Sequence, residues 1–82
     1  MIITSHILTT MKKDEIGTNA GLVWRTLFYK GSKASFNELL QSTGLNAIDL
    51  SSAIGWLARE DKVEFYYENG EEFIDVYRDI YY

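Results

Sequence analysis

Few residues in this 82-residue chain could carry out chemistry. There is no cysteine, so the chain can form no disulfide, thiolate nucleophile or thiolate metal site. The sole histidine, His6, lies in an N-terminal stretch without a clear hydrophobic period, and no acid–base pair or catalytic triad can be assembled around it. Gly17 and Gly21 are too sparse for a phosphate-binding loop. The sequence therefore predicts a protein that is not an enzyme and binds no cofactor.

Acidic side chains gather toward the C-terminus, at Glu68, Glu71, Glu72 and Asp75. Carboxylates of this kind could hold a hard cation, but their spacing is not that of an EF-hand loop. A solvated acidic surface explains them better, and no metal site is predicted.

Charge is divided unevenly along the chain. Residues 1–36 carry five basic and two acidic side chains, a net of +3, whereas residues 37–82 carry three basic and ten acidic side chains, a net of −7. Binding to nucleic acid requires basic side chains that neutralise phosphates, so the second part disfavours it. Two interpretations remain: an acidic surface that keeps the protein in solution, or one that meets a basic protein partner.

The length and composition favour one small domain with its own core. Hydrophobic residues make up 46% of the chain and aromatic residues 15%, which is more than a disordered chain contains. No stretch approaches the roughly 20 apolar residues of a membrane helix, and the N-terminus lacks the basic region of a signal peptide. We expect a cytoplasmic protein.

Helical periodicity predicts three helices. The first is expected from about Asp14 to Lys30, after a flexible extension over residues 1–12 and with Gly31 as its C-cap signal. The second is expected to begin with a capping box formed by Ser35 and Glu38. The predicted apolar faces comprise Ile16, Ala20, Val23, Trp24 and Leu27 in the first helix, and Leu50, Ala53, Ile54 and Leu57 in the third.

The second and third helices are separated by a tight turn, which is typical of a helix-turn-helix. The second helix is expected to end at Thr43-Gly44, and Asn46 is expected to cap the third. The segment Gly31–Ala34 is expected to form a short strand.

A β-hairpin is expected after the helices. Asn69-Gly70 suits a two-residue type I′ turn, which requires positive φ at both positions. The register places Val63, Phe65, Ile74 and Val76 on the face that covers the helices, and Glu64, Tyr66, Phe73 and Asp75 on the other. Glu64 then lies opposite Asp75, a like-charge pair that a cation or partner could relieve. Residues 78–82 form a tyrosine-rich tail.

Two segments carry a family resemblance, Ala53–Phe65 and Ile16–Trp24. Together with the order of elements, they resemble a family of small stand-alone bacterial winged helix-turn-helix proteins of unassigned function. The resemblance covers about residues 13–77. It implies an α+β winged helix-turn-helix fold, with three helices, a short strand and a C-terminal hairpin wing. It also implies DNA binding, with the third helix in the major groove.

The residues where DNA would be read depart from that expectation. The candidate DNA contacts are Ser52, Arg59 and Lys33, and Arg59 lies near the end of the third helix, whereas DNA-reading helices use their beginning. A DNA-binding wing would carry lysine or arginine where this one carries glutamate. Because fold alone does not fix function, DNA binding is the second hypothesis.

Protein contact is the first hypothesis. Ile48 and Trp56 are predicted on the outward face of the third helix, and Tyr66 and Phe73 on the outer face of the wing. With Tyr81 and Tyr82 of the tail, these residues form the candidate protein interface. The alternatives are that Trp56 belongs to the core and that the wing pair only steadies the hairpin. We expect a homodimer, an unidentified protein partner and a regulatory context, in which the chain could also be a remnant domain of a larger regulator.

Overall fold

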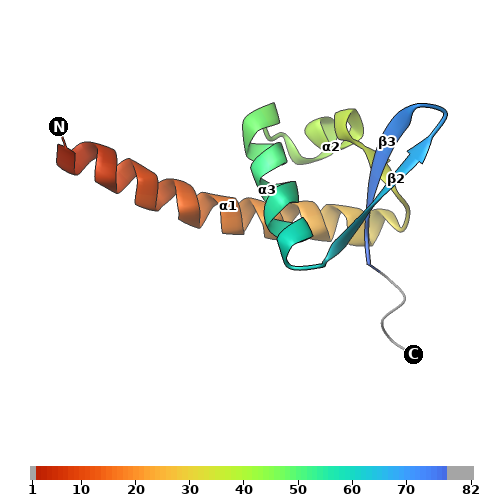
Figure 1. The fold of residues 1–82 in the computed structure, drawn as a ribbon, viewed down its shortest axis with the longest axis horizontal. Helices are drawn as coiled ribbons and strands as arrows, with labels where there is room; N and C mark the ends of the chain where they lie inside the picture. Colours follow the sequence, from red (N-terminus) through yellow and green to blue (C-terminus); the bar gives the residue numbers. More distant parts are fainter. Residues whose placement is uncertain (1, 78–82) are drawn as a thin grey trace.

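The computed structural model describes the backbone of residues 2–77 and the side chains of residues 13–77. The elements follow in the order α1 (Ile2–Lys30), β1 (Ala34–Ser35), α2 (Phe36–Thr43), α3 (Ala47–Arg59), β2 (Val63–Glu68) and β3 (Glu71–Val76). Figure 1 shows α1 passing alongside the α2–α3 pair, with the β2–β3 hairpin at the opposite end from its first turns. This is the winged helix-turn-helix arrangement predicted from the sequence.

Helix α1 begins much earlier than the sequence predicted. It starts at Ile2, not near Asp14, and it has no acidic residue in its first turn. Asp14, the predicted start, lies in its middle. The physical reason is that residues 2–13 contain neither glycine nor proline, so nothing interrupts a helix that tertiary packing stabilises further along. The domain limits 1–12, 13–77 and 78–82 stay predictions.

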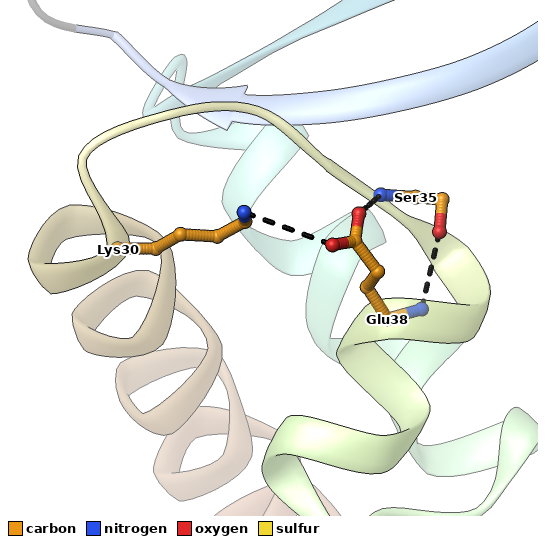
Figure 2. Close-up of polar contacts among 3 residues, drawn as sticks. All are labelled: Lys30, Ser35 and Glu38. Carbon is orange, nitrogen blue, oxygen red and sulfur yellow. Dashed lines mark hydrogen bonds and ion pairs between the residues drawn. The ribbon is translucent and has the colours of Figure 1, made fainter.

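Ser35 connects the sheet to the helix-turn-helix. Its Oγ accepts a hydrogen bond from the backbone N–H of Glu38 at 3.1 Å, and its own N–H donates to Glu38 Oε1 at 2.9 Å. Figure 2 shows this reciprocal pair, the predicted capping box, together with Lys30 at the end of α1, whose Nζ lies 3.7 Å from Glu38 Oε2. The Ser35 backbone hydrogen bond, aided by Lys30, holds the pKa of Glu38 below its ordinary value of 4.5.

The core lies where α1 meets α3 and the sheet. On α3, the predicted residues Leu50, Ala53, Ile54 and Leu57 are all buried. They belong to the same cluster as Ala20, Val23 and Leu27 of α1, Leu39 of α2, and Ala34, Val63, Ile74 and Val76 of the sheet. Asn46 caps α3 as predicted, because its side chain accepts from the Asp49 N–H at 2.8 Å. These contacts fix which side of α3 faces outward.

The three strands form an antiparallel sheet in the order β1-β3-β2. The hairpin register is the predicted one, from Val63 opposite Val76 to Tyr67 opposite Glu72. Asn69 and Gly70 both have positive φ, 55° and 81°, as the two-residue turn requires. Strand β1 covers Ala34–Ser35, so it begins later than predicted and ends in the capping residue.

Phe65 corrects the predicted inner face of the hairpin. Val63, Ile74 and Val76 are buried as expected, but Phe65 is 46% exposed. Its cross-strand partner Ile74 is only 3% exposed. The difference arises because β3 lies between two strands, whereas β2 is at the sheet edge. The alternation of side chains along a strand determines on which face of the sheet Phe65 lies. It does not determine whether another element covers that position.

Leu57→Ala is expected to destabilise the domain by about 2–5 kcal/mol, because it opens a cavity in a small core. Leu57 is 4% exposed within the cluster that joins α3 to α1. Ile48→Ala, on the exposed side of the same helix, is the control and should change stability by less than about 1 kcal/mol. Urea denaturation followed by circular dichroism measures both. Equal losses would mean that the packed side of α3 is misassigned.

Glu38→Gln is expected to flatten the acid dependence of stability. The wild-type carboxylate has a lowered pKa in the folded state, so its contribution is present above the unfolded-state value of 4.5 and is lost as the pH falls through the folded value. Glutamine can still bond the Ser35 N–H, but it does not titrate. Melting temperatures between pH 7 and pH 3 test this, and an equally steep acid loss in both proteins would contradict it.

Candidate interaction surface

The outward face of α3 is apolar at its beginning. Ile48, in the first turn, is 68% exposed. Around it, Asn46 uses its side chain to cap the helix, and Asp49 brings the only acidic group of the first turn. The part of a recognition helix that contacts base edges in helix-turn-helix proteins therefore presents a large aliphatic side chain and a carboxylate.

The three candidate DNA contacts are not equally available. Arg59 is exposed at the last residue of α3 and Ser52 is half-buried. Their separation of seven positions corresponds to about 10 Å along the helix axis. Lys33 is already engaged: its Nζ lies 3.3 Å from Glu68 Oε2 and 5.4 Å from the centre of the Phe73 ring. A lysine held between a carboxylate and an aromatic face contributes less positive charge to a phosphate-binding surface.

The outer face of the wing carries the predicted aromatic pair. Tyr66 and Phe73 are cross-strand partners, and Tyr66 is 39% exposed while Phe73 is half-buried under Lys33. The Tyr66 hydroxyl donates to Glu64 Oε1 at 3.1 Å, and the Val76 N–H donates to Asp75 Oδ1 at 2.7 Å. Both carboxylates of the predicted like-charge pair thus accept a hydrogen bond from a neighbour on the hairpin, which offsets part of their repulsion.

Trp56 lies against α1. A β-carbon built on Gly17 would be 3.8 Å from the Trp56 ring, so the indole lies over the backbone of α1 while remaining 41% exposed. It helps to form a groove of about 550 Å³ between α1, the end of α3 and the start of the sheet. We call this the α1–α3 groove. Its lining residues are Gly17, Ala20, Gly21, Trp24, Arg25, Trp56, Leu57, Glu60, Asp61, Lys62 and Tyr77.

The predicted interface residues are therefore distributed over separate places. Trp56 lines the α1–α3 groove, whereas Ile48 lies eight residues earlier on α3, about 12 Å along its axis. Tyr66 and Phe73 lie opposite each other on the wing. Tyr81 and Tyr82 are outside the described residues. That any of these residues contacts a partner stays a prediction.

The face of α1 that lines this groove was not predicted from the sequence. Gly17 and Gly21 lie inside α1, which agrees with rejecting them as a phosphate loop. Their spacing nevertheless held a signal: Gly17, Gly21, Trp24 and Phe28 follow each other at intervals of four, three and four, which places them on one helix face. Of these four residues, only Trp24 was included in the apolar face predicted from the sequence.

In the described part of the chain, no group of three or more histidine, cysteine, aspartate or glutamate residues is placed to hold a metal ion. Among the same residues, no helix combines the length and the hydropathy needed to cross a membrane.

Comparison with known proteins identifies related sequences and a related structure. The sequence profile of the winged helix-turn-helix domain (DUF2582) matches residues 11–76. The solution NMR structure of protein BT2368 from Bacteroides thetaiotaomicron is 38% identical in sequence and superposes with a TM-score of 0.70, covering 78% of this chain and 77% of that one. No curated protein matches the sequence.

Proposed function

The chain belongs to the winged helix-turn-helix domain family DUF2582, and we propose that it uses this fold for protein contacts, without catalysis, in a regulatory context. The single observation that carries the proposal is the 68% exposure of Ile48 in the first turn of α3. A base-reading helix places polar side chains at this point. Burying an aliphatic side chain at this position against an apolar protein surface is favourable, because it removes apolar area from water.

The charges of the wing support the same proposal. Its tip carries Glu68, Glu71 and Glu72 beside the turn. Glu68 also forms an ion pair with the nearby Lys33. Phosphates approaching the wing would meet carboxylates, whereas a basic or mixed protein surface would be attracted. Aromatic residues such as Trp56, 41% exposed, are enriched at the centres of protein interfaces.

DNA binding is the second candidate, because the helix-turn-helix fold often serves it and because Arg59 is exposed on α3. In that alternative Ser52 and Arg59 would reach the duplex, with Lys33 on the backbone after release from Glu68.

Binding to random duplex DNA is expected to be weaker than the roughly 10⁻⁴–10⁻⁶ M of non-specific binders at physiological salt. The charge-reversed wing Glu71→Lys/Glu72→Lys should bind more tightly, with a salt slope steeper by up to about 1.8, since each added phosphate contact contributes about 0.9. Fluorescence anisotropy at several salt concentrations measures both proteins. Micromolar wild-type binding with a steep salt slope would favour the DNA hypothesis instead.

A photo-crosslinking residue at position 48 is expected to capture protein in living cells. The matched control is the same residue at Gln41, which is exposed on α2 and outside the proposed surface. Adducts from position 48 should be destroyed by protease and resist nuclease, and they should be absent from position 41. Nuclease-sensitive adducts at position 48 would contradict the proposal.

A further inference from the structure

Helix α1 is longer than the body it supports. Its 29 residues correspond to about 43 Å. Among residues 13–30, the part of α1 whose side chains the structure describes, the buried residues are Ala20, Val23 and Leu27. Lys13 and Asp14 are already exposed, and Figure 1 shows the first turns projecting beyond α2 and α3. A projecting helical segment of about three turns is marginal in water without a surface to pack on.

The α1–α3 groove offers such a surface on the same helix. The Trp56 ring covers Gly17, whereas at Gly21 a β-carbon would meet only the end of the Arg25 side chain. Trp24 stacks on Phe28 with ring centres 4.9 Å apart. Phe28 is 40% exposed and the adjacent Tyr29 is 79% exposed. Spacings of four, three and four residues are those with which one helix packs along another.

Charges on the flank of this face specify a direction. Asp14 and Arg25 are both exposed, and eleven residues turn a helix by three full turns and about 20°. They therefore lie on the same flank, one before the glycines and one after them. In a parallel pair of helices, Asp14 would face Asp14 of the other copy and Arg25 would face Arg25. In an antiparallel pair, each Asp14 carboxylate instead meets the Arg25 guanidinium of the other helix.

We propose that the occupant of the α1–α3 groove is α1 of a second copy of this chain, packed antiparallel about a two-fold axis. This rests on the proposed function and names the partner and the surface. The axis passes between residues 19 and 20, so that Asp14 of one copy meets Arg25 of the other. Gly21 lies near the closest approach. Positions 11 and 10 of each α1 lie opposite Phe28 and Tyr29 of the second copy, and the turns before them extend past Lys30, where that helix ends. Such a contact is self-complementary, as a two-fold dimer requires.

The wing is a weaker site for self-association. Phe73 is half-buried beneath Lys33, and the Tyr66 hydroxyl is bonded to Glu64. Two acidic wing tips brought together would also repel. The self-association expected from the sequence is therefore assigned to α1, with Trp56 at its margin.

Analytical ultracentrifugation of the wild type is expected to show a dimer with a dissociation constant on the order of 10⁻⁴ M or tighter. Asp14→Arg alone and Arg25→Asp alone should each weaken it about tenfold, because two symmetry-related pairs become repulsive. The double variant Asp14→Arg/Arg25→Asp should recover the wild-type constant within about threefold, since the pairs are restored with reversed sign. A double variant no tighter than the single ones would overturn the proposal.

Gly21→Gln tests the groove by adding bulk without changing the net charge, and it also displaces the end of the Arg25 side chain. A β-carbon at Gly21 meets only the end of the Arg25 side chain, at 3.3 Å, so the fold should persist, as a thermal melt will verify, while the dimer weakens at least about tenfold. Gly55→Gln, where a β-carbon meets nothing within 4 Å on exposed α3, is the matched control and should dimerise normally.

The remaining outcomes separate this inference from the proposed function. A wild type that stays monomeric at millimolar concentration overturns the inference, as does a dimer unaffected by Gly21→Gln but abolished by Tyr66→Ser/Phe73→Ser. A crosslinker at position 21 that captures only a different protein overturns it as well. None of these results alters what position 48 captures, which tests the proposed function by itself.

Discussion

Ser35 connects the sheet, the start of α2 and the end of α1. Its backbone lies in β1, opposite Phe73 of the central strand, while its hydroxyl and N–H form the capping box with Glu38 at the start of α2. Glu38 in turn lies near Lys30 at the end of α1. Replacing an N-cap serine by alanine typically costs about 0.5–2 kcal/mol, a large share of the stability of a domain this small. This residue therefore links the start of the helix-turn-helix to both the sheet and α1.

Helix α1 provides the base on which the other elements pack. Val23 and Leu27 are completely buried, and they belong to the cluster that includes α3 and the sheet. Burying one side of the helix leaves an adjacent side, with Gly17, Gly21 and Trp24, open along the α1–α3 groove. A helix that is partly core and partly accessible surface would therefore connect the fold of one copy to the proposed dimer.

The fold and the surface of this protein point to different functions. The winged helix-turn-helix arrangement is one that often reads DNA, but Ile48 and Asp49 occupy the first turn of α3 and glutamates occupy the wing tip. Packing determines the fold through the buried residues, whereas binding is determined by the exposed ones, and the two sets vary independently. An acidic, partly apolar exterior on this scaffold favours contact with protein over contact with phosphate.

The sequence by itself determined the local features of this protein. Three of them follow from the chemistry of neighbouring residues and could therefore be predicted: the Ser35 capping box, the Asn46 cap, and the Asn69-Gly70 turn with its register. The exposure of Phe65 and the position of Trp56 over Gly17 were decided only by the tertiary structure. Each of them depends on which element covers a given face, and that is set by contacts between residues far apart in the chain, which no local pattern records.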